Sequence, residues 1–318
     1  MNHFRTRAFV LLLAVGLPAH ASLIFNTTWD ASVNSTNLAA SGEVAQFESA
    51  IGYVEGVYSG LFSNNITINL TVAVSSGKAI LGESDTNLAG TLTYGQLTSV
   101  LAADATSQDD NTAVANLPAV DPTGGAAFWL ATAQAKALGL ISANDPGNDG
   151  TVTFGGGWNY TFDPNNRSVP GDFDFIGVAE HEISEVMGRI GLLGTNLNGN
   201  PGYGVLDLFG YTAPGSLTLA QQVGGAYFSI DGGQTNLMAY NDAANGGDAK
   251  DWAGGTNDAF NAFTGPGGEN GLSSVDIREM NVIGYNDAPE PSSLLPLLLV
   301  GAGFVALRRR SVKPTKSI

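Results

Sequence analysis

Cysteine is absent from the 318-residue chain, and histidine is nearly absent, with only three residues. The lack of cysteine excludes disulfides, iron–sulfur clusters, thiolate zinc sites and cysteine nucleophiles. His3 and His20 lie at the extreme N-terminus, so His181 is the only histidine between residues 22 and 288. A site that takes two imidazoles from one chain is therefore excluded in that part of the protein.

Basic residues are also scarce, because Lys and Arg number 13 against 29 Asp and Glu. Seven of the basic residues and one acid lie in the two terminal segments. Six basic and 28 acidic residues remain between those segments, which gives a net charge of −22. Such a charge repels nucleic acid and anionic membranes, and we expect no nucleic-acid partner. It suits an extracellular protein that binds divalent cations.

The first 21 residues have the features of a secretory signal peptide. Arg5 and Arg7 precede the apolar run Ala8–Leu17, and Ala19–Ala21 fit the small-x-small rule, so we expect cleavage after Ala21. The alternative is a membrane anchor, for which the run is too short. Signal peptidase is therefore an expected processing partner.

Residues 289–310 combine the motif Pro289-Glu290-Pro291, an uncharged apolar segment at 292–307 and the cluster Arg308–Arg310, before a short basic tail at 311–318. Together they resemble a PEP-CTERM sorting signal. The resemblance implies that an exosortase cuts near the motif and releases or re-attaches the protein outside the cell. A permanent anchor is the alternative, although a helix of this length spans only about 24 Å. We expect a secreted or cell-surface protein that contacts the membrane only through this segment.

Hydrophobic periodicity predicts the α+β class for the residues between these ends. Apolar residues spaced by three and four predict helices over 41–62, 94–103, 126–140, 176–189 and 274–282. Alternation predicts a strand over 66–74, with shorter strands at 24–29 and within 148–162. No long linker interrupts residues 22–288, so we expect one domain in two lobes, with the helix near 176–189 between them.

The stretch HEISEVMGR, residues 181–189, carries most of the predicted chemistry. Residues four apart lie one above another on a helix, so His181 and Glu185 can point at one metal ion. Glu182 is offset by about 100° around the helix. There it can take the proton of a metal-activated water during attack on a peptide bond, as the catalytic base. A weak surface ion pair between His181 and Glu185 is the alternative.

The stretch resembles the zincin helix, and more narrowly the metzincin form H-E-x-x-H-x-x-G-x-x-H, at His181, Glu182 and Gly188. LDLF at 206–209 and NVIGY at 281–285 are similar to stretches in exported bacterial metalloproteases that end in PEP-CTERM signals. The resemblance covers most of residues 24–288. It implies a zincin-like domain with a twisted sheet, a central site helix and a loop-rich C-terminal lobe, zinc as cofactor, and a protein or peptide substrate.

Two ligand positions depart from the metzincin pattern, because Glu185 replaces the second histidine and Gly191 stands at the third ligand position. Zinc accepts carboxylate oxygen at about 2.0–2.2 Å, so one histidine with carboxylates can hold it. Such a site is harder in ligand character and less selective for zinc. Asp207, in an apolar stretch shortly after the helix, is our first candidate for the third ligand. A loop or cap role is its alternative.

Several weaker candidates have structural alternatives. Tyr211 or Tyr285 could donate to a developing oxyanion, or serve as buried structural tyrosines. The loops at 145–150 and 241–248 are candidate calcium sites, or simply turns. The strand at 66–74, if it lies at the edge of a cleft, would align an extended peptide by strand addition.

Rival functions also stay open. The chain has no G-x-S-x-G elbow, phosphate-binding loop or dinucleotide fingerprint. A glycosidase with paired acids stays open, because 28 acids offer many pairs. The main rival is a non-catalytic cell-surface or extracellular-matrix protein on a decayed metalloprotease scaffold, since the second histidine is missing.

Overall fold

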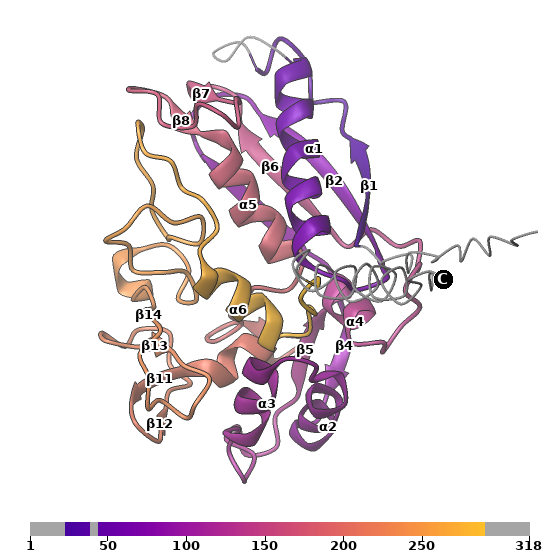
Figure 1. Ribbon diagram of the computed structural model, residues 1–318, viewed down its shortest axis with the longest axis vertical. Helices are drawn as coiled ribbons and strands as arrows, with labels where there is room; N and C mark the ends of the chain where they lie inside the picture. The colour runs from indigo at the N-terminus through magenta and orange to yellow at the C-terminus, as the bar shows by residue number, and fades with distance from the viewer. Residues whose placement is uncertain (1–22, 39–43, 290–318) are drawn as a thin grey trace, which may run out of the picture.

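The computed structural model describes residues 23–38 and 44–289 (Figure 1). The predicted signal peptide and nearly all of the predicted sorting segment lie outside these residues. The described part of the chain contains six α-helices and several small sheets, which confirms the α+β class. No helix in it is long and apolar enough to cross a membrane.

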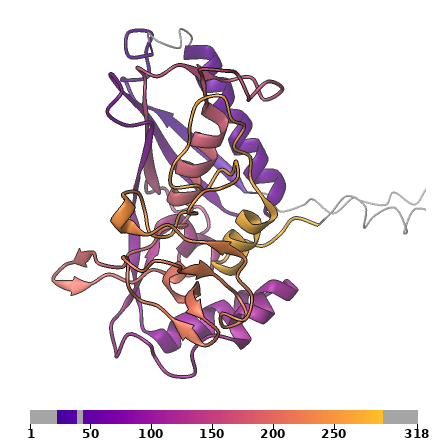
Figure 2. The same cartoon turned by 90° about the vertical axis from the view of Figure 1, so that its left-hand side faces the viewer.

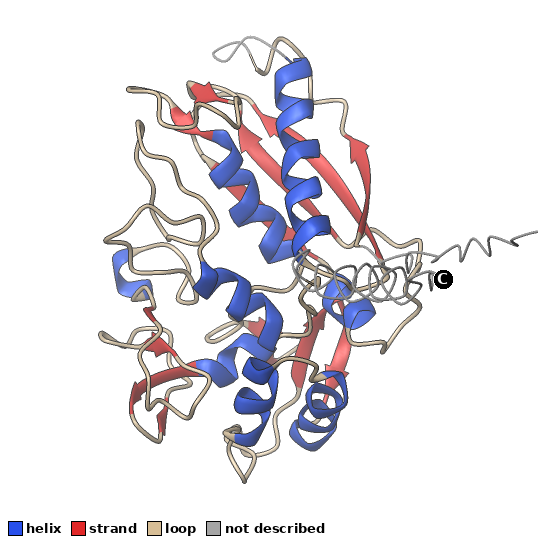
Figure 3. Cartoon of the chain, in the orientation of Figure 1, coloured by secondary structure: helices blue, strands red, loops and turns tan. Residues whose placement is uncertain are grey.

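Helices and strands are interspersed along the chain, and the strands that follow β6 are short (Figure 3). The helices are α1 Val44–Leu61, α2 Tyr94–Asp104, α3 Gln108–Ala115, α4 Thr132–Ala137, α5 Phe175–Val186 and α6 Ser274–Val282, with 3-10 helices η1 Val205–Phe209 and η2 Ala243–Asn245. The strands are β1 Ile24–Trp29, β2 Thr67–Ser75, β3 Gly82–Thr86, β4 Leu88–Leu92, β5 Phe128–Ala131, β6 Gly150–Gly155, β7 Tyr160–Thr161, β8 Phe173–Asp174, β9 Asn196–Leu197, β10 Asn200–Pro201, β11 Gly210–Ala213, β12 Ser216–Leu217, β13 Tyr227–Phe228 and β14 Met238–Ala239.

A four-stranded sheet in the order β1-β2-β6-β3 forms the base on which the site helix lies. The first three strands are parallel, and β3 runs antiparallel to β6 at the edge. Alternate residues of β2 are buried, as the sequence pattern predicts, because helices α1 and α5 cover only one face of the sheet (Figure 2). The opposite face carries threonine and asparagine.

Helices α1 and α5 lie side by side over this sheet (Figure 1). The ring of Phe175 on α5 lies 4.9 Å from that of Phe47 on α1 and 4.8 Å from that of Phe154 on β6, measured between centroids. The hydroxyl of Tyr58 donates to the carbonyl of Glu180 at 2.6 Å. Apolar packing and this buried hydrogen bond therefore hold α5 in place on the sheet.

Strand β2 is central, between β1 and β6, so the condition under which residues 66–74 would align a peptide, a place at the edge of a cleft, is not met. The edge belongs to β3, whose polar sequence Gly-Glu-Ser-Asp-Thr has no apolar alternation to predict a strand. Strand β3 pairs with β6 over five residues, and it also contacts α5.

The helix predicted over 126–140 is also only partly correct. Residues Phe128–Ala131 form strand β5, which pairs with β4, and only Thr132–Ala137 are helical. The backbone N–H of Trp129 also donates to the carbonyl of Tyr203 at 2.7 Å. Tertiary hydrogen bonds thus override a helical pattern at its N-terminal end.

Glu279 on α6 lies in the core of the second half of the chain. Its side chain is fully buried, the hydroxyl of Tyr240 donates to its Oε1 at 2.9 Å, and its Oε2 has no partner. Burial raises the pKa of Glu279 to about 8, from an ordinary value of 4.5. Between these values the folded protein holds a proton that the unfolded chain releases, so the free energy of unfolding falls as pH rises.

We expect Glu279→Gln, whose amide stays neutral, to flatten the decline of the melting temperature between about pH 5 and about pH 8. The slope removed is at most about 1.4 kcal/mol per pH unit. Thermal unfolding across this range checks the prediction, with the exposed Glu83→Gln as the control. Parallel pH curves for the parent and Glu279→Gln would contradict it.

Candidate metal centre

Helix α5 carries the site and ends at a glycine. The C-terminal cap of α5 is Met187, and Gly188 follows with φ +112°, a left-handed conformation that favours glycine. A Cβ atom at residue 188 would also approach the Cβ of Gln134 to 2.9 Å. The chain therefore turns sharply here, and Arg189 is directed back towards the site.

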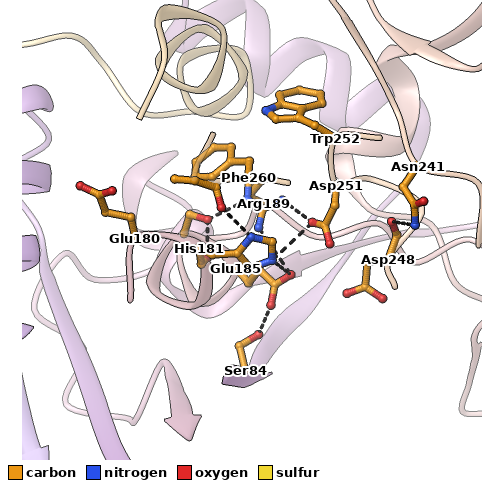
Figure 4. A network of polar contacts seen from close by, with 12 residues as sticks. Ser84, Glu180, His181, Glu185, Arg189, Asn241, Asp248, Asp251, Trp252 and Phe260 are labelled. Carbon is orange, nitrogen blue, oxygen red and sulfur yellow. Dashed lines mark hydrogen bonds and ion pairs between the residues drawn. The ribbon is translucent and has the colours of Figure 1, made fainter. Parts of the chain in front are cut away.

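The imidazole of His181 is held in one orientation. Its Nδ1 lies 2.9 Å from the carbonyl oxygen of Ala259, which can only accept, so Nδ1 carries the proton. Its Nε2 then faces Oε1 of Glu185 at 3.4 Å and Oδ1 of Asp251 at 3.5 Å (Figure 4). Metal-binding histidines commonly donate their second ring nitrogen to a carbonyl in this way.

The spacing of these three atoms fits a metal ion. One ligand atom from each of His181, Glu185 and Asp251 lies within 4.8 Å of the others. A tetrahedral zinc site with bonds of about 2.0–2.1 Å has ligand–ligand distances of about 3.3–3.4 Å. The two distances from Nε2 are close to that value. The described residues therefore contain one group of histidine and carboxylates that could hold a metal ion.

Asp207, our candidate for the third ligand, lies outside this group. It is fully buried in η1, and its Oδ2 accepts backbone N–H groups of Leu192 at 3.0 Å and Gly204 at 2.8 Å. Its Oδ1 lies 3.9 Å from the ammonium of Lys250. A cap role, the alternative given above, accounts for the hydrogen bonds that this carboxylate accepts. Asp251, and not Asp207, is the third member of the group.

The third ligand position of the metzincin pattern, Gly191, is filled by another residue's side chain. A Cβ atom at Gly191 would overlap Cγ of Lys250. The stem of Lys250 runs past Gly191, and its ammonium lies 4.6 Å from the ring centroid of Tyr240. A histidine at position 191 would not fit without moving Lys250.

The buried charges of the group stabilise one another. Burial opposes the charged imidazolium, but the carboxylates of Asp251 and Glu185 outweigh it and raise the pKa of His181 to about 10. Burial also opposes ionised Glu185, yet His181, Arg189 and Ser84 lower the pKa of Glu185 to about 2. Ser84 of β3 donates to Oε2 of Glu185 at 2.6 Å, which leaves Oε1 directed at His181.

Glu182 lies beside the group, on the wall of a cavity of about 120 Å³. A Cβ atom at Gly82, on edge strand β3, would lie 2.5 Å from Oε1 of Glu182, so only glycine leaves room for this carboxylate. Burial, and then the negative charge of Glu185, raise the pKa of Glu182 well above its ordinary value. A second acid, Asp258, also lines the cavity. The rest of the lining includes apolar and neutral polar residues, namely Leu81, Val178, Ala259, Ala262, Asn261, Thr264 and Asn270.

The other sequence candidates lie in structural positions. Tyr285 is fully buried and donates to the carbonyl of Met187 at 2.7 Å, and Tyr211 is buried in β11. In the 145–150 loop, Asp149 forms a buried ion pair with Lys136 at 2.6 Å. Among the described residues, neither candidate calcium loop gathers three His, Asp or Glu side chains around one point.

Comparisons of the chain with protein-family models, with curated proteins and with solved structures found no match. The assignment of Asp251 therefore depends on geometry. The sequence offers a faint signal for it, because NDAANGGDAKD at 241–251 gathers five acids and amides before the apolar Trp252. That signal resembles an ordinary turn, which is the alternative to calcium binding for the loop at 241–248, and that loop does not include Asp251.

The two candidate third ligands can be compared directly. We expect Asp251→Asn to lower the affinity for zinc at least about 100-fold, because a neutral amide replaces a charged ligand. Asp207→Asn should leave the affinity within about threefold of the parent. Competition with a chromogenic chelator measures both, and circular dichroism checks folding. The reverse order of the two variants would restore Asp207 as the ligand.

Proposed function

We propose that this protein is an exported, metal-dependent peptidase with a zincin-like fold. The observation that carries the proposal is the convergence of His181 Nε2 with the Glu185 and Asp251 carboxylates at 3.4 and 3.5 Å, beside the Glu182 cavity. The order of α1, β2, an antiparallel edge strand and the site helix α5 supports the same assignment. Export rests on the two predicted terminal signals.

Zinc is the ion that we propose, with another divalent metal possible in so carboxylate-rich a site. When bound, such an ion supplies a Lewis acid that polarises the peptide carbonyl and makes water more acidic. Glu182 accepts the proton of the attacking water and returns it to the leaving amine. Glu185 and His181 stay as ligands, because Ser84 and the carbonyl of Ala259 fix their second polar atoms.

The substrate that fits this arrangement is an extended peptide. Gly82 and Leu81 line the cavity at the start of β3, which is the edge strand of the sheet. A peptide added along that edge would hydrogen-bond to β3 and place one side chain in the cavity. The apolar wall formed by Val178 and Ala259 suits a neutral side chain, and the two acids of the lining, Glu182 and Asp258, disfavour an acidic one.

We expect Glu182→Gln to lower the rate of peptide hydrolysis by about 10²–10⁴ while bound zinc stays at the parent level, because the variant removes the base and keeps the ligands. Cleavage of an unfolded protein substrate and elemental analysis measure the two effects. Glu180→Gln, on the same helix but bonded to Arg167, is the matched control. Unchanged hydrolysis in Glu182→Gln would remove the proposed role.

A non-catalytic surface protein is the second candidate, and Arg189 favours it. The guanidinium Nη1 lies 2.7 Å from the Asp251 oxygen that faces His181, and Nη2 lies 3.5 Å from Glu185. With a protonated His181, the two carboxylates would be balanced without a metal ion.

Metal content separates these two functions. We expect about one zinc or manganese per chain in protein purified without a metal-affinity tag, and its loss in His181→Ala. Elemental analysis of both proteins is the measurement. Parent protein free of transition metal, and unchanged by added zinc, would favour the non-catalytic function.

A further inference from the structure

His181, Glu185 and Asp251 are called the metal group below. Arg189 makes more contacts with this group and its surroundings than a surface ion pair would. Its side chain is fully buried, one helical turn beyond Glu185. Its Nε donates to Ser184 Oγ at 2.7 Å, and its Nη1 donates to Asp251 Oδ1 at 2.7 Å. The centre of its guanidinium lies 4.2 Å from the ring centroid of Phe260. In Figure 4 a dashed line joins this side chain to Asp251.

The charges of the group explain why an arginine is needed. A ligand set of one neutral histidine, Glu185 and Asp251 carries two negative charges. The familiar zinc set of two histidines and one carboxylate carries only one. With Arg189 included, the present group also carries a net charge of −1. Two buried carboxylates without such a cation would repel each other and lose their hydration without compensation.

We propose that Arg189 is a positioning residue that compensates for the missing second histidine. It holds the Glu185 and Asp251 carboxylates at ligand spacing before an ion binds, and it neutralises one of the two charges. The inference rests on the proposed function, since it concerns the same metal group. This role differs from that of a purely structural ion pair, because the effect of Arg189 on protein stability then depends on whether an ion is bound.

The contacts of Arg189 allow it to hold the two carboxylates while these carboxylates still face an ion. A carboxylate oxygen has two lone pairs, so Asp251 Oδ1 can accept from Nη1 and still face an ion. Stacking on Phe260 and the bond to Ser184 keep the guanidinium plane in one position. The planar fork reaches two acids together, which the single ammonium of a lysine cannot reproduce.

The first test compares thermal unfolding of the full chain with zinc and with chelator. In Arg189→Met the two carboxylates lose their cation, so the metal-free protein should melt far below the parent. Because the two carboxylates are also no longer held at ligand spacing, zinc should bind more weakly, and we expect it to raise the melting temperature of this variant by less than about half of the rise seen in the parent. An equal rise in both proteins would overturn the inference, because a purely structural role lowers both states alike.

A second variant keeps the test decisive if Arg189→Met does not fold. Arg189→Lys retains the charge but not the fork, so we expect it to fold without metal and to bind zinc at least about tenfold more weakly. Competition with a chelator measures this affinity, with Arg167→Lys as the control, because it makes the same change at a buried arginine that pairs with Asp174 and Glu180 outside the group. Parent-like zinc affinity in Arg189→Lys would refute the positioning role.

These outcomes separate the inference from the function on which it rests. A parent protein that binds no zinc and shows no zinc-induced change in melting temperature refutes both. A parent that binds zinc, with variants that respond as the parent does, refutes only the role of Arg189. Neither readout requires peptide hydrolysis, so loss of catalysis alone cannot mimic either result.

Discussion

The hydrogen bond from His181 Nδ1 to the carbonyl of Ala259 is the contact on which the candidate site depends. It selects the tautomer that leaves Nε2 directed at the two carboxylates, and it ties helix α5 to the loop that follows Trp252. That loop is held in turn, because the N–H of Trp252 donates to the carbonyl of Phe260 at 2.8 Å. One backbone carbonyl thus joins the helix that supplies two candidate ligands to the loop region that supplies the third.

Most of the few basic residues between the terminal segments lie inside the molecule, where they pair with buried acids. Only six Lys and Arg occur between residues 22 and 288, and four of them are buried beside acids. The pairs are Lys136 with Asp149, Arg167 with Asp174, Arg189 with Asp251 and Lys250 with Asp207. Buried carboxylates need such partners, since an uncompensated charge in the interior is strongly destabilising. The surface is left acidic as a consequence.

Local patterns predicted the elements whose apolar spacing is regular. Helices α1, α2, α5 and α6 and strand β2 agree with the sequence to within a few residues. The pattern failed where long-range contacts decide, as in β5, where pairing with β4 replaces one end of a predicted helix. It also missed β3, because an edge strand with a polar sequence has no periodicity to detect. The relation of His181 to Glu185 was predictable, since it needs only a helix.

The sequence by itself determined that the site could not contain cysteine, or a second histidine from residues 22–288, and it determined the four-residue spacing of two candidate ligands. Helical geometry is local, so that spacing survives any tertiary arrangement. Only the tertiary structure decided that Asp251, rather than Asp207, joins the group, and that β3, rather than β2, borders the cavity. Both depend on how distant segments pack, and packing follows from burial and hydrogen bonding that no local pattern records.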